Sequence, residues 1–143
     1  MEKANVCFTK EVSKESLVKM YEMLGVQLPG KVAVKLHSGE QGNRNYLKPE
    51  FVEELVNHVH GTVVECNTAY PGARNTTEKH KKLMDEHEWT KYFDVDIMDC
   101  EGPDMELDVP NGKQIKKNYV GKHLANYDSM VVLSHFKGHA MGG

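Results

Sequence analysis

Hydrophobic and polar positions alternate with two different periods along this chain, and the two periods predict strands and helices in turn. Short apolar segments typical of buried strands occur at residues 31–37, 61–67, 95–100 and 129–136, with a further β-rich segment at 4–9. Helical spacing of apolar residues occurs at 13–26 and after Pro49, a residue type favoured at a first helical position. Asn75 and Glu78 have the spacing of a capping box, which predicts a helix from there to about Phe93.

The segment 105–120 has a different pattern, with two alternating stretches on either side of Asn111-Gly112. This dipeptide is typical of the tight turn of a β-hairpin. A short helix is expected at 121–128, before the last strand. The alternation of strands and helices predicts a single α/β domain over residues 1–143, with a mainly parallel sheet of about five strands, helices on both faces and an added β-hairpin.

Composition narrows the classes of protein to consider. Apolar residues make up 39% and charged residues 27% of the chain, as in ordinary globular domains. The net charge of −3 gives no basic patch for nucleic acid, and no apolar stretch approaches the length of a membrane span. The first ten residues lack the apolar segment of a secretory signal, and the three cysteines are far apart. We therefore expect a cytoplasmic protein with reduced thiols.

Polar side chains gather after the predicted strands, at the edge of the sheet where open α/β proteins bind ligands. Because the carboxyl ends of parallel strands meet at one edge, we expect these residues to form a common site. They are Lys35, His37, Glu40, Asn43, Asn45, Asn67, Tyr70, Arg74, His135, Lys137 and His139. The alternative is that these loops are polar only because they are exposed.

The residue types suggest roles within this site. Lys35 lies inside an apolar strand, so it requires a partner or a lowered pKa, unless its amine reaches water. Lys35 and Arg74 are expected to orient an anionic group. We expect Lys35, His37, Glu40 and His139 to be catalytic, the last three by handling protons or a metal, although solvated loop histidines remain an alternative. No metal ligands are assigned, because the chain contains neither an HExxH nor a C-x-x-C motif.

Two other groups of residues are expected to be structural. The segment EKHKKLMDEHEW (78–89) has the composition of a solvated, charged helix face. Cys7, Cys66 and Cys100 lack the tight spacing of iron–sulfur ligands, so we interpret them as buried structural thiols.

Three stretches together resemble a known family. They are VAVKLHSGEQGNRNYLKPEFV, ECNTAYPGARNTTEKH and VVLSHFKGHAMGG. They are similar to the uncharacterised iron–sulfur-centre proteins of domain-of-unknown-function family 362. The resemblance implies that this chain is the N-terminal part of a longer protein, whose missing C-terminal half carries cysteines for a 4Fe–4S centre. It implies no cluster ligands within these 143 residues and no particular reaction.

Two functions follow as hypotheses. The site is part of a redox or metal-assisted enzyme, or it is a non-catalytic module that binds a small anion or a metal. A third possibility is that the polar edge only docks on a partner.

Overall fold

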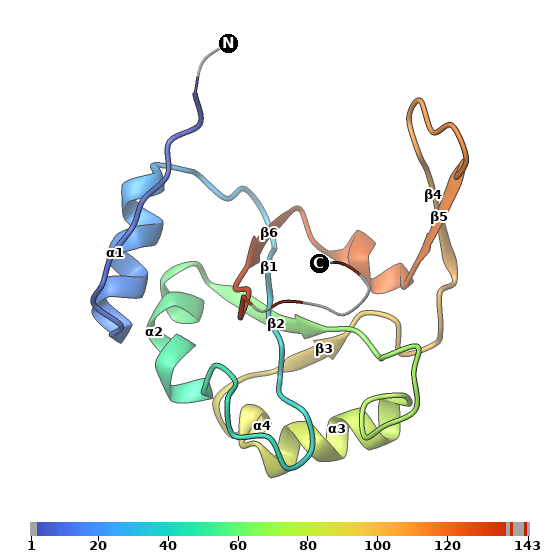
Figure 1. Ribbon diagram of the computed structural model, residues 1–143, viewed down its shortest axis with the longest axis horizontal. Coiled ribbons are helices and arrows are strands. Elements are labelled where there is room, and N and C mark those ends of the chain that lie inside the picture. Colours follow the sequence, from blue (N-terminus) through green and yellow to red (C-terminus); the bar gives the residue numbers. More distant parts are fainter. Residues whose placement is uncertain (1–2, 137, 139–141, 143) are drawn as a thin grey trace.

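The computed structural model describes residues 3–136, 138 and 142, and its centre is a parallel sheet of four strands (Figure 1). The strands lie in the order β3 (Val95–Ile97), β2 (Gly61–Glu65), β1 (Val32–Lys35) and β6 (Ser129–Val132). Lys35, the last residue of β1, is paired in register with Val64 of β2 and Val132 of β6. The loops that follow these strands therefore leave the sheet at one common edge.

The segment 4–9, expected to be a strand, is not one, so the sheet has four strands. It runs along α1 as an extended tail in which Val6 and Phe8 are 87% and 80% exposed (Figure 1). A β-rich composition makes a strand only where the edge of another strand is available to pair with it. The described residues bring no such edge to this tail.

In the part of the chain that the structure describes, four α-helices accompany the sheet: α1 (Lys14–Leu24), α2 (Pro49–His58), α3 (Thr77–Glu86) and α4 (Trp89–Tyr92). Ser13 caps α1 in a capping box with Ser16, and Gly25 ends it in the left-handed conformation. Pro49 opens α2 as predicted.

The predicted helix from Asn75 to Phe93 differs from the observed one at both ends. Thr76, rather than Asn75, is the N-cap, and its hydroxyl accepts a hydrogen bond from the Lys79 amide. The helix also does not continue to Phe93. Glu88 has a φ of 64°, which breaks the hydrogen-bonded ladder and separates α3 from the short α4.

The two faces of the sheet are covered unequally. One face carries the larger core, in which Val34 and Val63 pack with Leu55 of α2 and Trp89 of α4. The other face carries a smaller cluster of Ala33, Val64 and Met98. Partly buried Leu124 and Tyr127 pack against it, the first from the 3-10 helix η1 (Lys122–Asn126). Helices were expected on both faces of the sheet, and among the described residues the second face is covered by the short 3-10 helix η1. This is the short helix that was expected at 121–128.

The hairpin is confirmed. Strands β4 (Met105–Asp108) and β5 (Lys117–Val120) pair antiparallel and project from the body of the protein (Figure 1). The predicted tight turn at Asn111-Gly112 is wrong, because residues 109–116 join the two strands. The Gly112 amide donates to the Val109 carbonyl at 3.0 Å, so the turn is centred on Pro110 and on Asn111, whose φ of 59° asparagine tolerates better than most residues. Over the described part of the chain, no helix combines the length and apolar character needed to cross a membrane.

Candidate functional site

A buried charge cluster underlies the carboxyl edge of the sheet. It is built around Glu65, the last residue of β2, which is only 2% exposed. Its Oε2 accepts hydrogen bonds from Lys35 Nζ at 2.8 Å and from the Cys66 amide at 3.1 Å. Its Oε1 accepts from the Ser38 amide at 2.9 Å and from Arg74 Nη1 at 3.1 Å. Burial raises the pKa of Glu65, but Lys35 and these donors outweigh it, so the pKa lies below its ordinary value and the carboxylate stays ionised.

Lys35 therefore has the partner that its position in an apolar strand requires, and that partner is Glu65. Glu65 was not among the residues predicted for the site, although Glu65 is also a charged residue within the apolar strand TVVEC. The signal was the same for both residues: a charge in a strand buried on both sides needs an opposite charge nearby.

His80 and Ser38 complete the cluster, and both are fully buried. His80 Nδ1 lies 3.3 Å from Asn67 Oδ1, and His80 Nε2 lies 3.1 Å from Ser38 Oγ. An amide oxygen only accepts, so Nδ1 carries the proton and Nε2 faces the hydroxyl. Burial lowers the pKa of His80, which keeps the ring neutral. No substrate reaches this serine–histidine pair, so we assign it to the scaffold of the site.

The expectation of a solvated face over 78–89 is wrong for the inward side of α3 and α4. His80, Leu83, Met84 and Trp89 are each 2% exposed or less. Trp89 Nε1 donates to the Ser38 carbonyl at 2.9 Å, which ties α4 to the loop after β1. The helical spacing of His80, Leu83 and Met84 indicated this buried side in the sequence, but the many charged residues between them favoured the interpretation of a solvated face.

Arg74 connects the buried cluster to the surface. Its side chain is 6% exposed, and its Nη1 donates to Glu65. On its other side Nε donates to Glu40 Oε1 at 3.2 Å, and Nη2 forms a closer bond to the same oxygen. The Tyr70 hydroxyl adds a bond to Glu40 Oε1 at 3.3 Å. Although burial raises the pKa of Glu40, Arg74 brings it below its ordinary value. The guanidinium is therefore already held by two carboxylates.

His37 is held by the loop that follows it. The Gly39 amide donates to Nδ1 at 2.9 Å, so a neutral ring carries its proton on Nε2. Arg74 Nη2 lies 3.3 Å from Nε2 but can only donate, and Glu40 Oε1 at 3.7 Å is beyond hydrogen-bond range, so neither accepts the Nε2 proton. Burial and, after it, the Arg74 charge lower the pKa of His37, so the ring is neutral near pH 7. Gly39 is required here, because its φ is 99° and a Cβ would lie 2.7 Å from the Tyr46 ring.

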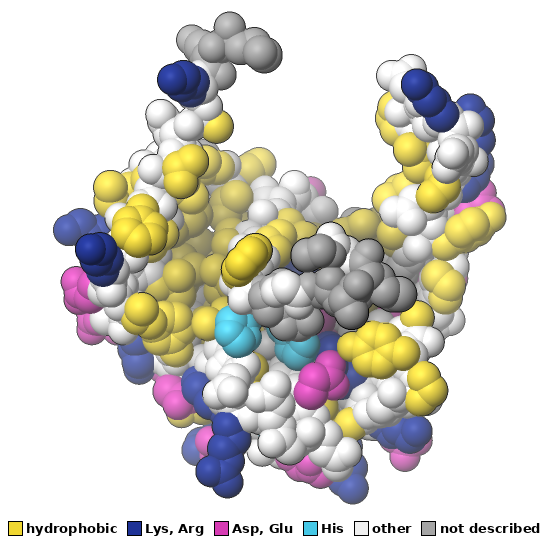
Figure 2. Space-filling view, in the orientation of Figure 1, with side chains coloured by type: hydrophobic (Ala, Val, Ile, Leu, Met, Phe, Trp, Pro, Cys, Tyr) yellow, Lys and Arg dark blue, Asp and Glu magenta, His cyan; other side chains and the backbone are white. Residues whose placement is uncertain are grey.

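His37, Glu40 and Tyr70 border a cavity of about 490 Å³, which we call the edge cavity. It is lined by His37, Gly39, Glu40, Asn43, Asn45, Tyr46, Tyr70 and His135. Figure 2 shows histidine and acidic side chains together near the centre of this face. The loops after β1 and β2 and the chain after β6 each contribute to the lining, as parallel strands with a common carboxyl edge require.

The remaining predicted site residues lie elsewhere. Lys35 and Arg74 are in the buried charge cluster behind the edge cavity. Asn67 borders a different hollow, near Thr77 and Cys100. Lys137 and His139 lie outside the described residues, so the expected proximity of His37 and His139 stays a prediction.

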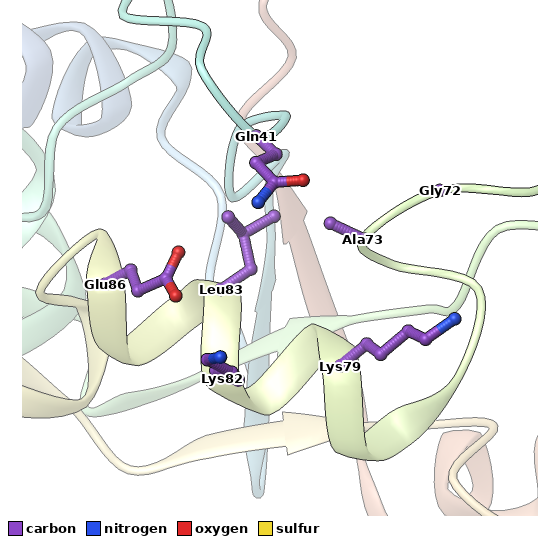
Figure 3. Close-up of a pocket in the computed structure, with 7 residues that line it drawn as sticks. All are labelled: Gln41, Gly72, Ala73, Lys79, Lys82, Leu83 and Glu86. Atoms are coloured by element: carbon purple, nitrogen blue, oxygen red, sulfur yellow. The ribbon is translucent and has the colours of Figure 1, made fainter.

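A further hollow of about 330 Å³ lies over α3, between the loops after β1 and β2 (Figure 3). Its floor is Leu83, toward which the amide of Gln41 points (Figure 3). Lys79, Lys82 and Glu86 follow along the helix. The two lysines and the glutamate do not converge on one point, so we assign no function to this hollow.

The residues present do not fit an iron–sulfur cluster. A 4Fe–4S centre takes four thiolate ligands, whereas this chain has three cysteines, all of them free thiols. Within residues 3–136, 138 and 142, no group of three His, Cys, Asp or Glu side chains is arranged to hold a metal ion. We therefore derive no chemistry through such a group on this chain.

Comparison with known proteins identifies a family for this chain but no individual relative. No curated protein and no solved structure matches the chain. A family model matches residues 32–143, which confirms the resemblance noted in the sequence, and its description names neither a cofactor nor a reaction. The chain belongs to the family described as Domain of unknown function (DUF362).

Proposed function

We propose that the edge cavity binds a small molecule through acceptor oxygens, such as those of a carboxylate or a phosphate. The carrying observation is the state of His37. With Nδ1 occupied by the Gly39 amide, the neutral ring offers Nε2–H as a donor at the cavity wall. A neutral imidazole held this way polarises a ligand oxygen without bringing in a charge.

Neighbouring groups support a ligand rich in acceptors. Asn43 Oδ1 accepts the Asn45 amide at 2.7 Å, so the Asn43 amide nitrogen is the part of that side chain left to donate. The charges behind the cavity balance, because Lys35 and Arg74 face Glu65 and Glu40. Both cations are thus occupied, and we place them behind the ligand, where Arg74 holds Glu40 in position.

Binding of inorganic phosphate, followed by two-dimensional amide NMR, tests this proposal. We expect shifts that saturate and that concentrate on Gly39, Asn43 and Asn45. Replacing His37 by Phe removes the Nε2 donor and should weaken binding by about tenfold, the effect of a hydrogen bond worth about 1.4 kcal/mol. Shifts confined to surface lysines, or unchanged binding in the variant, contradict the proposal.

His58→Phe is the matched control. The His58 side chain is 40% exposed and lies 3.9 Å from Glu22, whereas that of His37 is 39% exposed and lies 3.7 Å from Glu40. The two histidines therefore share exposure and an acidic neighbour, but His58 lies outside the edge cavity. We expect phosphate binding to be unchanged in His58→Phe.

A redox or metal-assisted enzyme stays a prediction for the longer protein, as does a cytoplasmic, reducing location. His37, Glu40 and His135 line the same cavity, but no three such side chains among the described residues are arranged to hold a metal ion, so the metal is the weaker alternative. A parallel titration with Zn²⁺ distinguishes this from the anion site, since stoichiometric zinc binding lost in His37→Phe would favour the metal. Absorption near 400 nm after anaerobic purification would reveal a cluster.

A further inference from the structure

Cys100 lies in a second group of reactive side chains, away from the edge cavity. It follows β3 in a tight turn, where its amide donates to the Ile97 carbonyl at 3.0 Å. The helix η1 packs onto this turn, and the His123 amide donates to the Met98 carbonyl at 3.3 Å. Gly121 permits the approach, because a Cβ there would lie 2.1 Å from the Met98 oxygen and 2.4 Å from Asp99 Cα. Local backbone packing thus brings Cys100 and His123 together.

The side chains form what we call the thiol cluster: Cys100, His123, Asp96 and Tyr127. Cys100 Sγ lies 3.6 Å from His123 Nε2 and 3.9 Å from Nδ1. His123 Nδ1 lies 2.7 Å from Asp96 Oδ1, and the Tyr127 hydroxyl donates to Asp96 Oδ2 at 2.8 Å. The carboxylate places the ring proton on Nδ1, which leaves Nε2 to accept the thiol proton. Nucleophile, base and orienting acid are therefore neighbours, although the nearly equal distances to the two ring nitrogens place the sulfur over the ring and not on the Nε2 lone pair.

Cys100 also has access to solvent. It is half-buried and borders a hollow of about 570 Å³, together with Asn67, Thr77 and Asp99. The side chains of His123 and Asp96 remain 28% and 21% exposed. Asp99 lines this hollow and Asp96 lies behind His123, so anionic reactants are repelled and uncharged ones are favoured.

The other thiols provide a contrast within the same chain. Cys66 packs against the small cluster of Ala33, Val64 and Met98. Burial, followed by the charge of Asp99, raises the pKa of Cys66 to about 11, so this thiol stays protonated at neutral pH. Cys7 lies in the extended N-terminal tail, where it is partly exposed.

We propose that Cys100 is a nucleophilic thiol that reacts with small uncharged electrophiles, with hydrogen peroxide as the example, and that His123 is its base. His123 Nε2 takes the thiol proton, and the thiolate attacks one peroxide oxygen. The S–O bond forms as the O–O bond breaks, and the leaving hydroxide takes the proton from the imidazolium to become water. Sulfur is oxidised to sulfenic acid and peroxide is reduced, so atoms and electrons balance. Asp96 and Tyr127 are positioning residues for His123.

Rates of alkylation by iodoacetamide at pH 7, mapped to each cysteine by mass spectrometry, test the activation. All three thiols report from one sample, so Cys7 and Cys66 act as internal controls. We expect Cys100 to react about tenfold faster than Cys7, because His123 lies beside its sulfur as a base. Cys66 should be slowest. Equal rates at Cys100 and Cys7 would overturn the proposal without any variant having to fold.

His123→Gln removes the base, and we expect it to slow Cys100 at pH 7 by about tenfold. At pH 10 the thiol ionises without help, so the variant and native rates should converge, which separates activation from mere access. Asp96→Asn should act in the same direction with a smaller change. The matched control is His58→Gln, a histidine remote from the cluster, which should leave all three rates unchanged. A deficit in His123→Gln that persists at pH 10 would mean a structural role only.

Hydrogen peroxide tests the reactant class. Trapping with dimedone should label Cys100 first in the native protein, and this preference should disappear in His123→Gln. Sulfenic acid that forms equally at Cys7 and Cys100 would contradict the proposal.

Discussion

A serine–histidine pair after β1 and a cysteine–histidine pair after β3 have nearly the same connections but different surroundings. In one, Ser38 Oγ meets His80 Nε2 and Asn67 Oδ1 meets Nδ1. In the other, Cys100 Sγ meets His123 Nε2 and an oxygen of Asp96 meets Nδ1. The first ring is completely buried, whereas the His123 side chain is 28% exposed. Connectivity alone would suggest two reactive triads.

The difference shows that two features determine whether such a pair is structural or reactive: its burial, and the residue that contacts Nδ1 of the histidine. An amide behind His80 cannot balance an imidazolium charge, and burial lowers the pKa of the ring further. A carboxylate behind His123 does balance that charge, and the half-buried Cys100 remains accessible. The buried charge cluster therefore supports the edge cavity, and the thiol cluster is the place for covalent chemistry.

Loss of the central carboxylate should break the buried charge cluster most severely. Glu65→Gln leaves Lys35 and Arg74 without their shared negative charge in a site that is 2% exposed. We expect the free energy of unfolding to fall by about 3–5 kcal/mol, measured by urea denaturation. The control is Glu106→Gln on the hairpin, whose exposed pair with Lys117 should contribute less than about 1 kcal/mol. Equal losses would show that burial does not distinguish the two pairs.

A methyl group at Gly121 should affect the thiol cluster specifically. Gly121→Ala forces η1 away from the Met98–Asp99 backbone, at a cost of about 1–3 kcal/mol in unfolding free energy. Displacement of His123 should also remove the preferential alkylation of Cys100. Gly72→Ala is the matched control, because no atom lies within 4 Å of a Cβ built there. Retained preference at Cys100 in Gly121→Ala would contradict this role of the glycine.

Acidification should weaken the fold through His80. Its pKa is lowered in the folded protein, so below about pH 6.5 the unfolded chain binds a proton that the folded chain does not. Unfolding free energy is therefore lost as the pH falls from about 6.5 toward the folded pKa, by at most about 1.4 kcal/mol per pH unit for one group. His37 contributes with the same sign, since its pKa is also lowered.

His80→Gln should flatten this pH dependence when unfolding is measured by urea at pH 7, 6 and 5. His58→Gln should leave the slope as in the native protein, which makes it the control. A slope that does not change in His80→Gln would assign the pH dependence to other groups.

The smallest effect is expected at Tyr127. Tyr127→Phe removes the hydrogen bond to Asp96, worth about 0.5–1.5 kcal/mol. Burial and the bond to Asp96 raise the pKa of Tyr127, so the hydroxyl stays protonated as a donor at all ordinary pH values. We expect Cys100 alkylation to slow less than in Asp96→Asn, since the carboxylate itself remains. A larger effect in Tyr127→Phe would place the tyrosine, and not Asp96, as the main positioning residue.

Much of the edge cavity followed from strand positions alone. His37, Glu40 and Tyr70 come after β1 and β2, and the carboxyl ends of parallel strands share an edge, so their proximity was predictable. In the supporting cluster, Glu65 had the same sequence signal as Lys35 and was overlooked, whereas Ser38 and His80 are recognisable only by what they contact. The thiol cluster was missed for the same reason, since Cys100 and His123 are separated by the whole hairpin.

By itself the sequence determined the local elements: the start of α2 at Pro49, the end of α1 at Gly25 and the presence of the hairpin, though not its turn. These depend on backbone geometry that a few neighbouring residues dictate. Only the tertiary structure decided that segment 4–9 lacks a partner strand, that Lys35 pairs with Glu65 and that Cys100 meets His123. Pairing, burial and charge balance depend on atoms brought together from distant parts of the chain, and local pattern contains no record of those distances.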